Sequence, residues 1–417
     1  MKGIKFKLTI LNFLEFFIFG SWLLSFGKYM FVNLHFTGTQ IGAIFMTLGF
    51  ASLIMPGIMG IIADKWSPNK LFALSHLVGA ALLYNMAQQP DYDGLFWASL
   101  FYLMLYMPSI GLDNTISYCL LERNDFDVVK VFPPIRVWGT IGFIIATWIT
   151  DSFGWGVNAN QFYFAAVASI VLGLFTLTLP DCAREKSETK KKTFSEAFGL
   201  DAFKLFANYK MATFFIFAML LGAALQITNM FGEAFLHDFG NIEAYKDTFA
   251  VKHNGWLMSL SQISETVFIL TIPFFLKKFG IKKVMLMSMF AWFLRFLLFG
   301  VGSPVGLGLI ALILSMIVYG MAFDFFNISG SLFVEQETDK KIRGSAQGLF
   351  IMMTNGFGAM IGAYGSGYVV DLFTKDGVKD WTSIWYVFAV YSLVLVILFA
   401  VMFKYKHDPA KLGEIKH

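Results

Sequence analysis

Acidic side chains lie inside long apolar runs of this sequence. Asp324 follows Tyr319 and Phe323 in the stretch YGMAFDFFN, and Glu265 lies in SQISETVFIL. An ionisable side chain at the centre of a lipid bilayer costs about 2.5–3.5 kcal/mol on insertion scales, so most such residues face a cavity or a partner. Burial also disfavours the charged form of a carboxyl group. We therefore predict that Asp324 exchanges a proton, binds a solute or does both, and Glu265 is the second such acid.

Other polar and aromatic side chains recur along these runs at the spacing of one helical face. The sets are Arg136, Thr140 and Phe143; Gln226, Asn229 and Glu233; Gln262, Glu265 and Thr266; and Tyr319, Phe323 and Asn327, with Asp324 beside them. Amides donate and accept hydrogen bonds, and carboxylates accept them from hydroxyl groups. Aromatic faces stack on a flat ring. The combination suits an uncharged, polar solute that contains a ring.

Several of these side chains also have a purely structural interpretation. Gln226 and Asn229 could join neighbouring helices by hydrogen bonds, as amides do inside membranes. Arg136 could close a salt bridge at a cytoplasmic gate without contacting a solute. Tyr319 and Phe323 could be ordinary packing residues. The spacing alone leaves both interpretations open.

Four further ionisable residues lie in or near the apolar runs. Glu233 is close to the outer end of its run and could simply be solvated. Arg295 is expected to pair structurally or to extend its charge toward the interface. Glu15 and Asp113 are either polar residues of helix packing or additional protonation sites, and the sequence does not decide between the two.

The composition predicts a membrane-spanning scaffold for these side chains. Of the 417 residues, 57% are hydrophobic and 14% are charged, whereas a soluble domain has about 25% charged residues. Twelve apolar runs have the length of a membrane-spanning helix. They cover approximately residues 8–30, 39–62, 70–88, 94–119, 136–155, 160–180, 211–235, 254–276, 282–300, 304–333, 344–372 and 381–404. The sequence therefore predicts an all-α membrane protein with twelve transmembrane helices.

The longest polar break divides the chain into two halves. We expect an N-terminal six-helix bundle over residues 1–180, a cytoplasmic linker over 181–210 and a C-terminal six-helix bundle over 211–417. Most of the 32 Lys and Arg residues lie at the N-terminus, in the even-numbered breaks and in the C-terminal tail. Because basic residues collect on the cytoplasmic side of a membrane, both termini are predicted to be cytoplasmic.

The two halves also resemble each other. ADKWSPNKLF (63–72) follows the second run, and LKKFGIKKVM (276–285) follows the eighth, the equivalent run of the second half. Short basic loops can resemble one another by chance, but here the similarity is in register with the count of runs. Two repeated halves are typical of alternating-access transporters, which bind their substrate between the halves near the middle of the membrane.

Several segments resemble the bacterial nucleoside:H+ symporters of the major facilitator superfamily. These segments are PPIRVWGTIGFI (133–144), LGAALQITNMFG (221–232), SQISETVFILTIPFF (261–275), FGIKKVM (279–285) and VYGMAFDFFNISG (318–330). The resemblance extends from the first run to MFKYKH (402–407), which is nearly the whole chain. It implies the superfamily fold of two six-helix bundles and proton-driven uptake of purine and pyrimidine nucleosides across the bacterial inner membrane.

The resemblance also implies the residues of the site. The implied substrate-binding residues are Arg136, Thr140, Phe143, Gln226, Asn229, Gln262, Glu265, Tyr319, Phe323 and Asp324. Asp324 and Glu265 are the leading residues for proton coupling. Glu15 and Asp113 are acids where the resemblance implies neutral residues, and Glu233 is also atypical, so the number of coupled protons stays open. The implied partners are nucleosides, protons and the lipid bilayer, and the expected state is a monomer.

The remaining features exclude other classes of function. The net charge of +4 is too small to indicate nucleic-acid binding. The two cysteines, Cys119 and Cys182, indicate neither a disulfide framework nor a metal site. The chain contains no H-E-x-x-H, G-x-S-x-G or P-loop pattern, so we expect no enzyme. No cofactor is expected, and the proton is the coupling ion.

Two alternative functions stay open at this stage. The first is proton-coupled transport of another neutral polar solute, such as a sugar or a glycoside. The second is a receptor or sensor built on a transporter fold. A sensor is expected to carry an output domain or a long tail, whereas the tail after the last apolar run is short, YKHDPAKLGEIKH.

Overall fold

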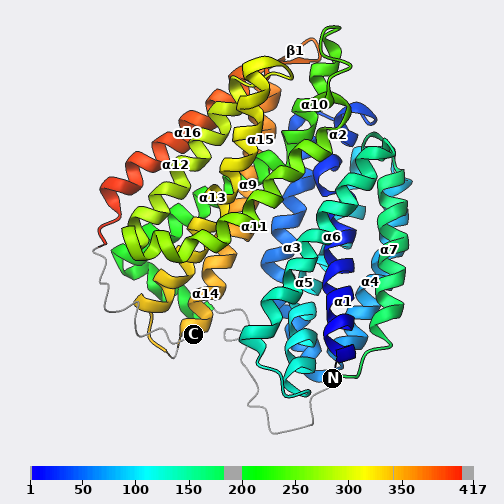
Figure 1. Ribbon diagram of the computed structural model, residues 1–417, viewed down its shortest axis with the longest axis vertical. Coiled ribbons are helices and arrows are strands. Elements are labelled where there is room, and N and C mark those ends of the chain that lie inside the picture. Colours follow the sequence, from blue (N-terminus) through cyan, green and yellow to red (C-terminus); the bar gives the residue numbers. More distant parts are fainter. Residues whose placement is uncertain (1, 183–199, 341, 406–417) are drawn as a thin grey trace. The chain divides into compact units, whose positions relative to one another are not determined.

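The computed structural model describes residues 2–182, 200–340 and 342–405, and helices dominate them (Figure 1). The contacts divide the chain into two compact units. The first comprises Met1–Phe36 and Ala43–Thr193, and the second comprises Thr37–Gly42 and Phe194–His417. Most of the expected linker, residues 183–199, lies outside the described residues, as does the tail from residue 406 onward.

The first half of the chain forms seven α-helices and one 3₁₀ turn within its described residues. They are α1 (Lys2–Gly20), α2 (Leu23–Val32), α3 (Gly38–Lys65), α4 (Pro68–Ala87), α5 (Tyr92–Glu122), α6 (Val128–Ser152), η1 (Trp155–Val157) and α7 (Asn160–Thr176). Within this unit α1 packs against α5, α6 and α7, and α4 packs against α5 and α7. Helix α1 therefore contacts three of the other helices of this unit, α5, α6 and α7.

The second half forms the remaining elements. They are η2 (Leu200–Ala207), α9 (Tyr209–Asp238), η3 (Phe239–Asn241), α10 (Phe249–Lys252), α11 (Asn254–Phe279), α12 (Ile281–Gly300), α13 (Gly306–Glu337), α14 (Arg343–Ile351), η4 (Met352–Gly358), α15 (Ala359–Leu372), β1 (Thr374–Lys375), β2 (Val378–Lys379) and α16 (Trp381–Met402). Here α13 packs against α11 and α12, and α9 packs against η4 and α15.

The expected all-α membrane fold is confirmed, with local differences from the twelve expected runs. Ten helical segments of the described residues are long and apolar enough to cross a membrane. The run expected at 160–180 forms the shorter helix α7. The run expected at 344–372 is split into α14, the π-helical segment η4 and α15. The first run breaks between α1 and α2, at Ser21 and Trp22.

Short polar side chains fix where many of these helices begin. Asp91, Asp127 and Asn208 each accept a hydrogen bond from a backbone N–H in the first turn of α5, α6 and α9. Ser67 does the same for α4, where Pro68 occupies the first helical position. Such N-caps satisfy donors that have no partner within the helix. The polar breaks seen in the sequence are thus helix start signals.

The only strands among the described residues are β1 and β2, which have two residues each and form an antiparallel hairpin near the end of the chain. Thr374 lies opposite Lys379 in an antiparallel pair, and the turn residues Asp376 and Gly377 both have positive φ. An Asp-Gly turn is a frequent solution for such a hairpin, because it tolerates positive φ at both positions. The hairpin occupies the break between α15 and α16.

A disulfide joins Cys119, near the end of α5, to Cys182, with the two Cα atoms 6.2 Å apart. The expectation that the two cysteines form no disulfide is therefore wrong. The 63-residue separation carries no signal, and tertiary packing brings the two residues together. Asn69 at the start of α4 contributes to this packing, because its side chain bonds the Pro180 carbonyl and the Cys182 N–H.

Helices α1 and α6 approach each other through glycines. A Cβ atom built on Gly142 would lie 2.2 Å from the carbonyl oxygen of Phe13, and one on Gly20 would lie 2.3 Å from that of Phe143. Contacts this short with backbone atoms cannot be relieved by moving a side chain. Glycine at positions 20 and 142 is therefore required for α6, which carries Arg136, to lie this close to α1.

The first prediction concerns this pairing. Gly142→Ala should lower the thermal stability of the purified protein in detergent, because forcing extra volume into a packed contact costs about 1–3 kcal/mol. The matched control is Gly60→Ala on α3, where nothing lies within 4 Å of the added Cβ. Equal melting temperatures of the two variants would show that α1 and α6 can move apart to accommodate the added methyl group without loss of stability.

Candidate functional site

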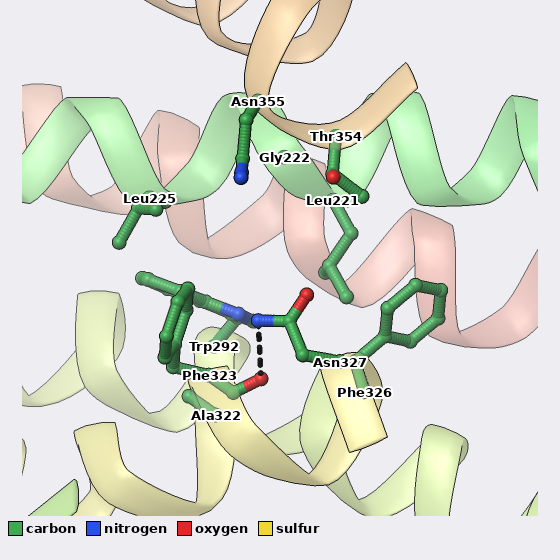
Figure 2. A pocket seen from close by; sticks show the side chains of 10 residues that line it. All are labelled: Leu221, Gly222, Leu225, Trp292, Ala322, Phe323, Phe326, Asn327, Thr354 and Asn355. Atoms are coloured by element: carbon green, nitrogen blue, oxygen red, sulfur yellow. Dashed lines mark hydrogen bonds between the residues drawn. The ribbon is translucent and has the colours of Figure 1, made fainter. Parts of the chain in front are cut away.

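A pocket in the second unit is formed by α9, α12, α13 and η4 (Figure 2). The space free of protein atoms at this pocket is about 290 Å³, part of which is open to solvent. The lining residues are Leu221, Gly222, Leu225, Trp292, Ala322, Phe323, Phe326, Asn327, Thr354 and Asn355. Apolar and aromatic walls with a few polar groups are the usual construction of a small-molecule site.

The polar part of this pocket comes from the π-helical segment η4. Figure 2 shows Asn355 extending from η4 into the pocket, on the side opposite Phe323 and Trp292. The side chain of Asn327, by contrast, donates a hydrogen bond of 3.2 Å to the carbonyl oxygen of Phe323. π-Helical segments occur frequently at functional sites, since the extra residue redirects side chains.

An aromatic stack continues from the pocket toward α12. The rings of Tyr319 and Phe323 are nearly parallel, with an interplanar angle of 2° and centroids 6.0 Å apart. Trp292 meets Tyr319 edge to face, with centroids 5.9 Å apart. Phe323 thus presents a flat ring to the pocket, and its orientation is supported by the two aromatic residues behind it. This is a surface on which a planar solute can stack.

Arg295 stabilises this stack from behind. Its guanidinium carbon lies 4.5 Å from the centroid of the Tyr319 ring, and Nη1 donates to the Ser315 carbonyl at 3.0 Å and to Ser261 Oγ at 3.2 Å. The side chain is only 1% exposed. Arg295 is therefore a structural cation that fixes Tyr319, in agreement with the structural pairing expected for it.

The two acids of the second unit influence each other. Asp324 on α13 is 5% exposed, and its carboxyl group lies within electrostatic range of Glu265 on α11. Among the residues that the structure describes, Asp324 Oδ2 has no hydrogen-bond partner. The side-chain oxygens of Gln226 and Gln262 are likewise buried without a donor in that part of the chain. Buried polar atoms are rarely left unsatisfied, so water, a proton or a ligand is expected at these atoms.

The predicted residues of the first unit lie on one face of α6, toward α1. The guanidinium carbon of Arg136 is 3.8 Å from the centroid of the Phe16 ring. Phe143 is buried and meets Phe19 edge to face at 6.3 Å. Thr140, between them, is half-buried. The same-face arrangement follows from helical spacing, whereas the cation–π contact with Phe16 was not visible in the sequence.

Not every predicted site residue falls in the pocket of the second unit. Phe323 lines it, and Tyr319 supports Phe323 from behind. On α9, Gln226 is buried and Asn229 is half-buried, and neither lines the pocket. Glu233 is 2% exposed, so the suggestion that it is simply solvated is wrong.

Trp292, Thr354 and Asn355 line the pocket, although they are not among the site residues predicted from the sequence. Trp292 lies in an apolar run without a polar neighbour that would single it out. The pair Thr354 and Asn355, in contrast, interrupts the apolar run at 344–372. That interruption was a usable signal, because polar residues inside such a run usually face a cavity or a neighbouring helix.

These features define a class of protein. The chain has membrane-spanning helices in two units, buried acids, and a pocket with amide and aromatic walls. This is the construction of a secondary transporter with the major facilitator fold. A model of the family described as nucleoside H+ symporter matches residues 1–408. The chain belongs to this family, and a transporter family confirms the expectation that the protein is not an enzyme.

Individual relatives agree with this assignment. The chain is 52% identical over 412 residues to the nucleoside permease NupG of Escherichia coli (strain K12), covering 99% of this chain and 98% of that protein. It is 53% identical over 418 residues to the xanthosine permease of the same organism, covering 100% of this chain and 99% of that protein.

Solved structures support the fold. A crystal structure of the nucleoside transporter NupG superimposes with a TM-score of 0.91 at 51% identity, over 97% of this chain and 100% of that chain. A bacterial homologue of the human lysosomal transporter Spinster, in an inward-facing and unoccupied conformation, gives a TM-score of 0.69 at 13% identity, over 96% of both chains. The second likeness shows the fold alone.

The second prediction tests the pocket. Asn355→Ala should weaken nucleoside binding by the purified protein about five- to tenfold, since a net hydrogen bond contributes about 1 kcal/mol and tenfold corresponds to about 1.4 kcal/mol. Binding is measured by calorimetry or by ligand-induced thermal stabilisation. The matched control is Asn241→Ala, which changes an exposed amide of η3. An unchanged dissociation constant for Asn355→Ala would remove this residue from the site.

Proposed function

We propose that this protein imports purine and pyrimidine nucleosides together with protons across the bacterial inner membrane. Membership of the nucleoside H+ symporter family carries this proposal. Two of its relatives are a nucleoside permease and a xanthosine permease. The buried acids, the unsatisfied amide oxygens and the half-buried ring of Phe323 in the pocket support it, since a nucleoside offers hydroxyl groups, heteroatom edges and a flat base.

The proposed substrate site combines the residues derived from helical spacing with one that the structure adds. The set is Arg136, Thr140, Phe143, Gln226, Asn229, Gln262, Glu265, Tyr319, Phe323 and Asp324, together with Asn355. The base stacks on Phe323, and the amides and carboxylates hydrogen-bond the base edges and the ribose. Two six-helix bundles, expected over residues 1–180 and 211–417, alternate in opening this site to the two sides of the membrane.

Asp324 and Glu265 are proposed to couple transport to the proton. Two carboxylates within electrostatic range of each other cannot both be ionised cheaply in a buried site, so the pair favours the binding of one proton. The membrane potential supplies about 2.3 kcal/mol per charge per 100 mV. One proton per cycle therefore suffices to concentrate a neutral nucleoside more than tenfold.

The proposal includes an orientation and an assembly state. The distribution of Lys and Arg favours cytoplasmic termini. We expect a monomer, because the substrate and proton sites are proposed to lie within one chain. The protein is not expected to bind nucleic acid.

The third prediction tests the function itself. Energised vesicles that contain the protein should accumulate labelled uridine and adenosine, and a protonophore should abolish the accumulation. Unlabelled nucleosides should compete with this uptake, whereas free sugars should not. Uptake that persists unchanged after collapse of the proton gradient would refute symport, and competition by sugars would favour transport of a different polar solute.

The fourth prediction concerns Asp324. Asp324→Asn should abolish proton-driven accumulation but retain nucleoside exchange between the two sides of the membrane, because the amide keeps the shape of the side chain and loses the titrating group. The matched control is Asp93→Asn, which changes an exposed carboxylate at the start of α5. Concentrative uptake at the wild-type level by Asp324→Asn would exclude this carboxyl from coupling.

A further inference from the structure

A second buried ionisable cluster lies inside the first unit, and the function proposed above does not use it. Glu15 on α1 and His76 on α4 are 0% and 2% exposed, and the distance between Glu15 Oε2 and His76 Nε2 is 2.8 Å. Ser109 Oγ on α5 lies 2.6 Å from Glu15 Oε1 and 2.7 Å from the Tyr106 carbonyl oxygen. Ser169 on α7 lies 3.2 Å from His76 Nδ1. Four helices therefore meet at one acid and one imidazole.

The contacts of Ser169 determine which ring nitrogen of His76 carries a hydrogen. The Ser169 hydroxyl has one proton, and it donates that proton to the backbone carbonyl of His76 at 2.9 Å. Toward Nδ1 its oxygen can then only accept a hydrogen bond. His76 Nδ1 must therefore be protonated and must donate to Ser169. In a neutral imidazole of this form Nε2 carries a lone pair, and Nε2 is the atom that faces Glu15.

One bound proton follows from this arrangement. An ionised carboxylate can only accept hydrogen bonds, and so can the unprotonated Nε2 of a neutral imidazole. Two such atoms 2.8 Å apart would repel each other. A proton must lie between Glu15 Oε2 and His76 Nε2, whether the pair is described as carboxyl and imidazole or as carboxylate and imidazolium. The closed cluster thus holds one exchangeable proton.

The groups around the pair also lie within electrostatic range of Arg136. Asp113 on α5 is fully buried and accepts from Asn12 Nδ2 at 3.2 Å, and the charges of Glu15 and of Arg136 on α6 act on it. Two tyrosines of α5, Tyr102 and Tyr106, are further titratable groups within electrostatic range of Glu15. Helix α7 contributes the uncharged Ser169 to the cluster.

Arg136 acts on the same neighbours as the pair. Both Glu15 and Arg136 lie within electrostatic range of Asp113 and of Tyr106. Loss of the proton from the pair adds a negative charge to this buried region, which is costly unless the surroundings change. A movement of Arg136, or a change in its partners, therefore alters how tightly the pair holds its proton.

Packing alone does not require an acid at position 15. A glutamine there would accept from Ser109 with its oxygen and donate to His76 Nε2 with its amide, so every contact of the pair would be kept without an ionisable group. An acid in this place adds a titrating proton and no additional contact. This comparison favours proton exchange over a purely structural role.

We propose that the Glu15–His76 pair is a second proton-binding site, and that the transporter consequently moves two protons with each nucleoside. The inference rests on the proposed symport. The proton binds between Oε2 and Nε2 when the cluster opens to one side and leaves to water on the other side, where carboxylate and neutral imidazole remain. Substrate binding at Arg136 links this step to the proton exchanged at Asp324.

The fifth prediction compares the wild type with Glu15→Gln in proteoliposomes at a fixed membrane potential. The proton-to-nucleoside ratio, obtained from the potential at which net flux reverses, should be two for the wild type and one for Glu15→Gln. At 100 mV the maximal accumulation should then fall about fifty-fold in the variant, since each proton contributes about 2.3 kcal/mol. Nucleoside exchange without a gradient should continue and shows that the variant is folded. Glu122→Gln, at an exposed position at the end of α5, is the matched control.

The outcomes separate this inference from the function on which it rests. A ratio of one in the wild type, or the same ratio in the wild type and Glu15→Gln, would overturn the second site and leave symport intact. Absence of proton-driven uptake by the wild type would overturn both. His76→Gln provides a second variant, which should also lose one proton. Infrared spectra of the purified wild type should show a pH-dependent carboxyl or imidazolium signal that Glu15→Gln removes, and the same pH-dependent change in both proteins would contradict the proposal.

Discussion

The cost of burying charge is the constraint on which the rest of this structure depends. The chain meets it in three ways. Arg295 is surrounded by fixed partners, a serine hydroxyl, a backbone carbonyl and an aromatic face. The Glu15–His76 pair holds one proton between its two members. Asp324 keeps one carboxyl oxygen unpaired within the described residues and lies near Glu265. Only the Glu15–His76 pair and Asp324 can change their charge by gaining or losing a proton in the proposed cycle.

The scaffold has to hold these groups at fixed distances. Close backbone contact between α1 and α6 sets Glu15 and Arg136 on adjacent helices, and glycine at positions 20 and 142 permits it. In the second unit the parallel rings of Tyr319 and Phe323 depend on Arg295 behind them. The polar groups are therefore positioned by closely packed helix pairs.

The sequence predicted the membrane-spanning helices and the division into two halves, but not the local irregularities of the helices. Apolar runs and the distribution of basic residues indicate spans and halves, because lipid requires long apolar helices. The π-helical segment with Asn355 and the break at Ser21 and Trp22 depend on backbone hydrogen-bond choices that periodicity does not record. The disulfide of Cys119 depends on a tertiary approach that sequence spacing cannot express. For the same reason, spacing found the aromatic face of α13 but not Trp292 on the neighbouring helix.

The contrast between Arg295 and Glu15 shows why burial alone does not identify a coupling residue. Both side chains are almost fully buried. The guanidinium of Arg295 is a strong base whose contacts are two hydrogen-bond acceptors and an aromatic ring, so it is expected to keep its charge. Glu15 faces an imidazole whose other nitrogen is already committed to Ser169. The geometry therefore leaves one shared proton as the only variable, and a group with two accessible states is what a transport cycle requires. The ability to change state, and not the depth of burial, separates the proposed coupling acids from the structural cation.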